Sequence, residues 1–360
     1  MAKGVLYGFI LFILVISVTL SAQAAETTVE NQKDRNISIN LTKGKNGKYP
    51  VNPVIDGESP TTGLPWTGEY KPLLVQIDNS DGGVGNMAPW GVNRADIVYE
   101  FPLTGGGHTR LTFLFSDEMP ESVGPVRSAR LGNVWLREEW DAGIAYYGGP
   151  SSEEVSIMRE FRKLGAVKKG VLFNGTDGAG KPWKAFYWRV AGKAGPHNVS
   201  VNAAGLQTLL PPDHVSPSRP FLFTDEPLDT GAYASRVTLV YPHKGYVSTF
   251  EYDDNVDQYY RFLRGIPYAD ELTGEPVSFS NIIVQRMKIK YSGGSPSPET
   301  IGRGNAEIFM SGRYIPGYWV RGSMEDRTIF LDENGNELRL QRGKTYVAIM
   351  TYAYPVTYEP

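Results

Sequence analysis

The sequence contains no cysteine and only 4 histidines. The absence of cysteine excludes disulfides and a lipid-modified cysteine, so the chain must be held together by its core. It also excludes the thiolate ligands of structural zinc sites. The histidines are His108, His197, His214 and His243. Their spacing is not typical of paired metal ligands. We therefore predict no metal, and we find no motif that indicates a cofactor.

A strong excess of charge of either sign is also absent. The chain has 36 Lys and Arg against 39 Asp and Glu, which gives a formal net charge of −3. Nucleic-acid-binding domains usually carry a basic excess that neutralises phosphates. The composition therefore argues against nucleic acid as a partner.

Long hydrophobic runs are missing except at the N-terminus. Lys3 precedes an apolar run from Val5 to Leu20, and Ala22-Gln23-Ala24 offers the small residues that a signal peptidase recognises. We predict that residues 1–24 are a signal peptide and that the mature protein is extracytoplasmic, secreted or associated with the cell envelope. The alternative is an uncleaved anchor, because the run is only slightly shorter than a membrane span. Contact with the membrane would then be through this segment alone.

The remainder divides by composition into a tether and two domains. Residues 25–52 are rich in Asn, Lys, Thr and Gly without an apolar period, which predicts a flexible tether. Residues 53–210 alternate strand-sized and helix-sized patterns, which predicts an α/β or α+β layered domain. After the turn-rich stretch around Pro211-Pro212, residues 216–360 contain many strand-sized runs and few helix signals. They predict a mostly β domain, with a hairpin turn at Asn334-Gly335.

The positions of the first-domain elements follow from hydrophobic periodicity. Strands are expected over 71–79, 95–101, 109–115, 142–147, 171–173 and 185–188. A helix is expected over 128–140, and a second one is expected to begin at Ser151-Ser152, where a hydroxyl can cap it and Glu153-Glu154 follow in the first turn.

The segment Gly124-Pro125-Val126-Arg127-Ser128-Ala129-Arg130 is the sharpest candidate for a functional site. Gly and Pro predict a turn, and the helix is expected to begin directly after it. Arg127 and Arg130 are three residues apart and would share a face of the helix. Guanidinium groups beside helix N–H groups suit phosphate or carboxylate. The alternative is that both arginines pair with internal acids and only hold the loop in place.

Other polar residues are candidates for the same site. Asp96 and Glu100 are four apart on a predicted strand and so face the same way. With Asp78, Arg110, Arg127 and Arg130 they could line a polar cleft or form a structural ion-pair network. His197-Asn198 follows Gly195-Pro196, and it could supply a base near the arginines or a hydrogen-bonded loop histidine.

Three familiar motifs are approached but not completed. Gly175–Lys181 has the spacing of a phosphate-binding P-loop, but Pro182 stands where the magnesium-binding Ser or Thr belongs. The stretches that begin at Asp253 and at Asp332 match only the first ligand positions of a calcium-binding EF-hand loop. We therefore predict neither nucleotide nor calcium binding.

Short motifs occur in a fixed order over about residues 60–360, in two blocks. In the first block they are Ile77-Asp78-Asn79, 95–100, Gly107–Arg110, Gly124–Arg130, Gly148–Ser151 and Pro196–Val199. In the second block they are Tyr252, Tyr260-Arg261, Gly265–Pro267, 302–306, Gly312-Arg313, Gly317–Trp319, Gly335-Asn336 and Gly343–Thr345. This order resembles that of the YerB-like family of bacterial exported proteins and lipoproteins. The resemblance implies two adjoining domains in a bacterial, extracytoplasmic protein of unestablished function, and it implies no catalytic residues.

Three functions fit the sequence. The first is a non-enzymatic protein of the cell envelope in which the segment containing Arg127, Ser128 and Arg130 binds an anionic wall polymer, peptide or protein partner. The second is an envelope enzyme that acts on phosphate-linked wall precursors, with Asp78, Asp96 or His197 as the base. The third is a scaffold in which the arginines are purely stabilising.

Overall fold

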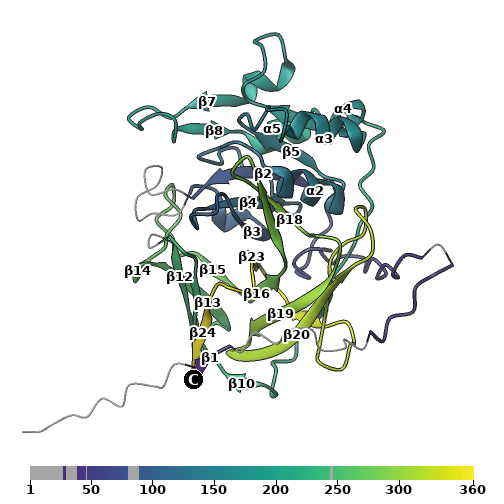
Figure 1. The fold of residues 1–360 in the computed structure, drawn as a ribbon, viewed down its shortest axis with the longest axis vertical. Helices are drawn as coiled ribbons and strands as arrows, with labels where there is room; N and C mark the ends of the chain where they lie inside the picture. The colour runs from purple at the N-terminus through teal and green to yellow at the C-terminus, as the bar shows by residue number, and fades with distance from the viewer. Residues whose placement is uncertain (1–26, 30–38, 46, 80–88, 244–245) are drawn as a thin grey trace, which may run out of the picture.

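The computed structural model describes the whole chain except residues 1–26, 30–38, 46, 80–88 and 244–245 (Figure 1). Its largest feature is an 11-stranded sheet, the main sheet, with the strand order β10-β20-β19-β16-β23-β3-β4-β2-β5-β6 and with β21 paired to β20. Five strands come from the N-terminal half, here residues 53–216: β2 (Leu73–Asp78), β3 (Ile97–Pro102), β4 (Thr109–Phe115), β5 (Gly143–Tyr146) and β6 (Leu172–Asn174).

The other six strands of the main sheet come from the C-terminal half, residues 217–360. They are β10 (Ala232–Tyr233), β16 (Asn281–Arg286), β19 (Gly302–Met310), β20 (Arg313–Arg321), β21 (Ile329–Leu331) and β23 (Thr345–Met350). The two halves meet where β23 runs parallel to β3, with Thr345 opposite Ile97 and Ala348 opposite Glu100. On its other side β23 runs parallel to β16. The main sheet therefore continues without a break from one half into the other.

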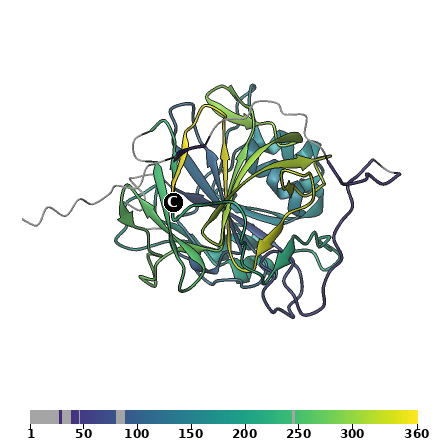
Figure 2. The same ribbon diagram turned by 90° about the horizontal axis from the view of Figure 1, so that it is seen from below.

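A second, seven-stranded sheet lies against the main sheet. It contains β1 (Thr27–Thr28), β24 (Val356–Glu359), β11 (Arg236–Val240), β12 (Val247–Asp253), β13 (Gln258–Leu263), β14 (Ile266–Pro267) and β15 (Ser278–Phe279). Tyr346 of β23 packs against Phe250 and Phe279 of this sheet, with ring centroids 5.0 and 5.1 Å apart. Seen from below, the second sheet lies to one side of the main sheet (Figure 2).

The helices are short, and the longest of them, α2 (Leu131–Trp140), covers the face of the main sheet opposite the second sheet. The others are α3 (Ile157–Lys163), α4 (Ala166–Lys169) and α5 (Ala203–Gln207), with 3-10 turns η1 (Val92–Arg94) and η2 (Pro182–Phe186). Trp140 of α2 donates from Nε1 to the hydroxyl of Tyr99 on β3 at 2.9 Å. Three two-stranded ribbons complete the fold: β7 (Tyr187–Arg189) with β8 (Val199–Val201), β9 (Leu222–Thr224) with β22 (Arg339–Gln341), and β17 (Ile289–Ser292) with β18 (Ser295–Pro298).

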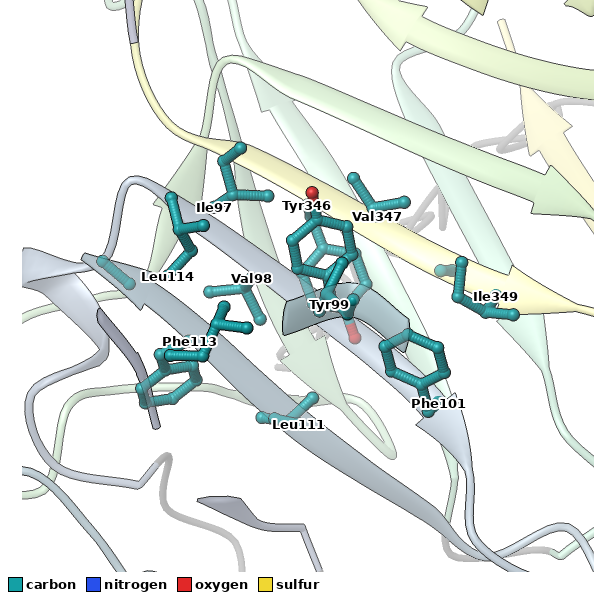
Figure 3. Close-up of a cluster of buried hydrophobic side chains, with 14 of the residues drawn as sticks. Ile97, Val98, Tyr99, Phe101, Leu111, Phe113, Leu114, Tyr346, Val347 and Ile349 are labelled. Carbon is teal, nitrogen blue, oxygen red and sulfur yellow. The ribbon is translucent and has the colours of Figure 1, made fainter. Parts of the chain in front are cut away.

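The central strands are buried on both faces. Every residue of β2, β3, β4 and β23 is buried. Their aromatic and β-branched side chains suit such a position, since they pack well on a pleated surface. Figure 3 shows this core, in which Val98 and Phe113 of neighbouring strands lie beside one another and Tyr346 and Val347 of β23 continue the packing.

The predicted fold class is confirmed in part. The chain is mostly β, and β2, β5 and β6 form parallel pairs beside helices, as expected of a layered α/β region. However, β2, β4 and β3 pair antiparallel. On the face of β3 turned away from α2, Glu100 contacts Tyr346, which packs on the second sheet and not on a helix. The hydrophobic runs in the sequence indicated that these strands are buried. They did not indicate which element covers each face.

Two local predictions need correction. The second helix begins at Ile157, where Ser156 caps it by accepting from the N–H of Arg159, so Ser151-Ser152 are not its start. The stretch predicted as a flexible tether joins the fold at its described residues. Thr27 and Thr28 pair with β24, and Asn40 donates its N–H to the carbonyl of Gly335 at 2.9 Å. Backbone pairing at a sheet edge needs no apolar side chains, so composition alone could not reveal it. The predicted signal peptide lies outside the described residues.

We expect that the N-terminal half produced alone, residues 53–216, does not unfold cooperatively. It would lack β23 and the second sheet, and so would expose an edge and a buried face of its central strands. Thermal unfolding followed by near-ultraviolet circular dichroism tests this, with the chain from residue 39 to 360 as the control. A fragment that melts as sharply as the control, at the same temperature, would contradict the expectation.

Candidate functional site

The segment that carries the candidate arginines is threaded between three parts of the N-terminal half. The N–H of Arg127 donates to the carbonyl of Gln76 on β2 at 2.8 Å, and the N–H of Val126 donates to Val199 of β8 at 2.7 Å. The N–H of Tyr147 donates to the carbonyl of Arg127 at 2.9 Å. At the start of the segment, a Cβ on Gly124 would lie 2.4 Å from the ring of Trp90, so only glycine permits this path.

Asp78, at the end of β2, lies at the centre of the site. Its side chain is 1% exposed, and its Oδ2 lies 3.4 Å from Nε of Arg127. The same oxygen pairs with Nδ1 of His197, whose side chain is 21% exposed. Two residues far from Asp78 in the sequence therefore converge on one buried carboxylate.

Arg110 stands beside Asp78 on the neighbouring strand. The two residues are directly opposite in the β2–β4 register, so their side chains share a face of the sheet. Arg110 is 5% exposed, and its Nη1 donates to the carbonyl of Ser128 at 2.8 Å. Burial, with a further contribution from the positive charge of Arg130, lowers the pKa of Arg110 to about 9.

Arg130 immediately precedes α2 and is partly buried. Its N–H donates to Oδ1 of Asn133 at 2.7 Å, which satisfies one backbone donor at the helix start. Its Nη1 donates to the carbonyl of Ala129 at 2.9 Å. Burial and the neighbouring charge of Arg127 lower the pKa of Arg130.

The cluster formed by Asp78, Arg110, Arg127, Arg130 and His197, here the arginine cluster, carries an excess of positive charge. Neither Arg110 nor Arg130 forms an ion pair with a carboxylate among the residues that the structure describes. Nε of Arg110 has no hydrogen-bond partner in the same part of the chain. Buried cations are normally paired, because desolvation penalises an isolated charge. The arrangement is therefore suited to receive an anion.

Ser128 and Asn198 support the backbone of the site. The hydroxyl of Ser128 donates to the carbonyl of Tyr147 at 3.1 Å. Asn198 accepts from Nη1 of Arg189 at 2.6 Å and donates to the carbonyl of Lys193 at 2.9 Å. Its amide is thus engaged at both ends, and it fixes the loop that carries His197.

Glu100 was predicted to join this cleft but lies on the other face of the main sheet. Its carboxylate accepts from Thr109 at 2.6 Å, from Asn79 at 3.2 Å and from the hydroxyl of Tyr346 at 2.5 Å. The guanidinium of Arg261 lies 5.2 Å from the ring of Tyr346 and adds a positive charge on that side. Phe101 lies directly opposite Arg110 in the β3–β4 register, so their side chains share a face of the sheet. Because side chains alternate along β3, Glu100 points to the other face. Glu100 therefore links the two halves rather than the arginines.

Asp96 was also predicted to line the cleft, and it lies at the opposite end of β3. Its Oδ2 accepts from the hydroxyls of Ser116 and Thr61 at 2.6 and 3.0 Å. It accepts from the N–H groups of Ser116 and Asp117 as well, at 2.7 and 3.2 Å. Burial and the neighbouring Asp117 carboxylate raise the pKa of Asp96 to about 7. Asp96 and Glu100 do share a face, but the length of the strand separates Asp96 from the arginines.

A small pocket adjoins the arginine cluster, and sequence reasoning missed it. Arg110 and Arg130 line one part of it, and the rest of its lining comes from Phe101, Pro102, Leu103, Gly132, Asn133, Ile289, Pro296 and Pro298. The last three belong to the β17–β18 ribbon of the C-terminal half. No local signal in the sequence joins residues 289–298 to Arg110, because the link exists only through the main sheet.

The described residues contain no group of three or more His, Asp and Glu side chains placed to hold a metal ion. Among the same residues, no helix is both long enough and apolar enough to cross a membrane.

Comparison with known proteins places these residues in a family. Residues 61–216 match the N-terminal domain of a protein family of unknown function, DUF3048, and residues 237–347 match the C-terminal domain of that family. The chain belongs to this family. The arginine cluster lies within the first matched domain, and the ribbon that completes the pocket lies within the second.

A relative and a solved structure agree with this assignment. The YerB protein of Bacillus subtilis (strain 168), whose name describes it as a candidate lipoprotein, is 26% identical over 303 residues, which cover 81% of this chain and 86% of YerB. The crystal structure of YerB from Bacillus subtilis matches with a TM-score of 0.66 at 24% identity, covering 81% of this chain and 96% of that chain. The predicted resemblance to YerB-like proteins is thus confirmed, and the family brings no established function.

We expect Asp78→Asn to lower the free energy of unfolding by about 3 kcal/mol, because it leaves buried positive charge without its carboxylate. Asp225→Asn is the matched control. Asp225 pairs with Arg342 at the surface, with its side chain 76% exposed, and its loss should cost less than about 1 kcal/mol. Urea unfolding measures both values. Equal effects of the two substitutions would show that Asp78 does not neutralise the cluster.

Proposed function

We propose that this chain is an extracytoplasmic protein of the cell envelope that binds an anionic group of a wall polymer, peptide or protein partner through the arginine cluster. The observation that carries this proposal is the charge imbalance. Three guanidinium groups, those of Arg110, Arg127 and Arg130, lie near one another. One buried carboxylate, that of Asp78, lies beside Arg110 and Arg127.

The lowered pKa values of Arg110 and Arg130 support the same conclusion. Each reflects a charged group that loses hydration and lies near other cations. An anion placed between these groups would remove the repulsion and replace the lost hydration. Guanidinium groups present planar forks of N–H donors, which fit the oxygens of phosphate and carboxylate groups.

Two features support the location at the envelope. The N-terminal apolar run followed by small residues is typical of an export signal. The chain also resembles a Bacillus protein named as a candidate lipoprotein. This chain lacks the cysteine that would carry such a lipid, so any attachment to the membrane would use the N-terminal run itself.

Arg130→Ala tests the anion site with little risk to the fold. Because Arg130 has no carboxylate partner among the described residues and repels Arg127, its loss should leave the melting temperature unchanged or slightly raised. Inorganic phosphate and pyrophosphate should raise the melting temperature of the wild type but not that of the variant. Differential scanning calorimetry with increasing anion concentration measures this, since a ligand stabilises the state that binds it.

Arg303→Ala, which removes an exposed arginine on β19, is the control and should respond to phosphate as the wild type does. A purely stabilising role for the arginines makes the opposite prediction. Arg130→Ala would then be clearly less stable than the wild type, and no anion would stabilise either protein more than the control.

The pairing of His197 with Asp78 favours a second candidate function, an envelope enzyme that acts on phosphate-linked wall precursors. A carboxylate at Nδ1 fixes the tautomer and orientation of an imidazole, so that Nε2 is the nitrogen that exchanges a proton with a substrate. In a hydrolysis, Nε2 would take a proton from water as the water oxygen bonds to phosphorus. The bond to the leaving phosphate would break, and the arginines would neutralise its charge.

Turnover separates the two candidates. If the second is right, pure protein with a lipid-linked pyrophosphate and added divalent metals should release phosphate. His197→Gln should then lower the rate by a factor of about 100 or more, a typical loss for a general base. His214→Gln is the control, because His214 is a partly buried histidine that contacts the carbonyl of Asp141 instead. Absence of turnover by the wild type would reject the enzyme and leave the binding function standing.

A further inference from the structure

The pocket beside the arginine cluster combines charge with an apolar lining. Arg110 and Arg130 supply positive charge, and six apolar side chains supply most of the remaining wall: Phe101, Pro102, Leu103, Ile289, Pro296 and Pro298. A site for a small inorganic anion needs donors on every side. A pocket wall that is positively charged on one part and apolar on the other suits a ligand with an anionic group and an apolar group.

The β17–β18 ribbon forms the outer wall of this pocket. Pro296 and Pro298 of β18 are buried, while Lys290, Tyr291 and Ser292 of β17 are exposed. Close approach of the ribbon to α2 depends on Gly132, where a Cβ would lie 3.0 Å from the ring of Phe101 and 3.2 Å from Pro298. The ribbon thus closes the pocket by lying against the first turn of α2.

Apolar packing holds the ribbon in this place. Within the described part of the chain, its ladder bonds join β17 only to β18, and no hydrogen bond or ion pair links residues 289–298 to the N-terminal half. Proline has no backbone N–H, so the two prolines that face α2 leave no donor unsatisfied if the ribbon moves away. Movement of the ribbon would therefore break no polar contact with α2.

The enclosed space measures about 10 Å³, which is enough for a water molecule but not for an alkyl group. An organic ligand must therefore displace the ribbon from α2. The ligand would then cover the apolar surfaces of α2 and of the ribbon that had been in contact. These surfaces would therefore stay out of contact with water.

We propose that the ligand of the arginine cluster is a phosphate ester whose organic part is apolar, and that this part lies between α2 and the β17–β18 ribbon. The inference rests on the proposed anion-binding function and specifies its ligand. The phosphate contacts Arg110, Arg127 and Arg130, and the apolar part contacts Phe101, Ile289 and the two prolines. Three guanidinium groups offer more N–H donors than the two oxygens of a carboxylate can use, which favours phosphate.

A reversible disulfide tests whether the ligand enters beneath the ribbon. A Cβ on Gly293, in the turn of the ribbon, would lie 3.9 Å from the Cβ of Glu154 in the N-terminal half. This separation suits a disulfide. The double variant Glu154→Cys/Gly293→Cys would contain the only two cysteines of the chain, since the sequence has none. Oxidation would fasten the ribbon over the pocket, and reduction would release it.

The probes are inorganic phosphate and hexyl phosphate, measured by isothermal titration calorimetry on the same protein before and after reduction. Each methylene transferred from water to an apolar surface can tighten binding by up to about fourfold. We expect the reduced protein to bind hexyl phosphate at least about tenfold more tightly than phosphate. We expect the oxidised protein to bind the two probes equally, because only the phosphate end can then reach the arginines.

Three other outcomes are informative. Equal binding of the two probes by the reduced protein would overturn the inference while leaving anion binding intact. A preference for hexyl phosphate that survives oxidation would also overturn it, because the alkyl group would then lie elsewhere. If the wild type binds neither phosphate nor hexyl phosphate, the proposed function and this inference are both overturned.

A second variant keeps the test available if the double-cysteine protein does not fold. Ile289→Ser removes a partly buried apolar side chain from the pocket wall and should abolish the preference for hexyl phosphate while preserving phosphate binding. Ile301→Ser is the matched control, since Ile301 is 45% exposed and lies outside this pocket. Equal preferences in the two variants would count against the proposed position of the alkyl group.

Discussion

The parallel pairing of β23 with β3 is the constraint on which the rest of the structure depends. It inserts a strand from the C-terminal end of the chain between β3 and β16 and so joins two sets of strands into one sheet. Parallel neighbours are usually buried on both faces. Here α2 covers one face and the second sheet covers the other. Across the junction, the hydroxyl of Tyr346 on β23 donates to Glu100 on β3.

Buried charged side chains are paired differently on the two faces of the main sheet. On the face turned to the second sheet, Glu100 is satisfied by hydroxyl and amide donors from Thr109, Asn79 and Tyr346, with Arg261 nearby. That arrangement is complete without a ligand. On the face turned to α2, Asp78 cannot satisfy Arg110, Arg127 and Arg130 together. The difference identifies the second face as the place where a ligand would contribute most.

The sequence predicted the parts of the site but not their grouping. Periodicity located β2, β3, β4 and α2 to within three residues, because their buried faces impose alternation or helical spacing. It also selected Asp78, Arg110, Arg127, Arg130 and His197, which the fold brings together. It grouped Glu100 and Asp96 with them wrongly. Glu100 lies on the other face of the main sheet, and Asp96 lies at the other end of β3.

What the sequence by itself determined is local: the positions of strands and turns, the Gly-Pro turn that leads to Arg127, the absence of cysteine and the family motifs. The tertiary structure alone decided three further matters. These are the insertion of β23 beside β3, the separation of Glu100 from the arginines by the sheet, and the closure of the pocket by residues 289–298. The first and the third depend on contacts between segments more than 150 residues apart, and such contacts leave no periodic signal in either segment. The second depends on the register of β4 beside β3, in which Arg110 lies opposite Phe101 rather than Glu100.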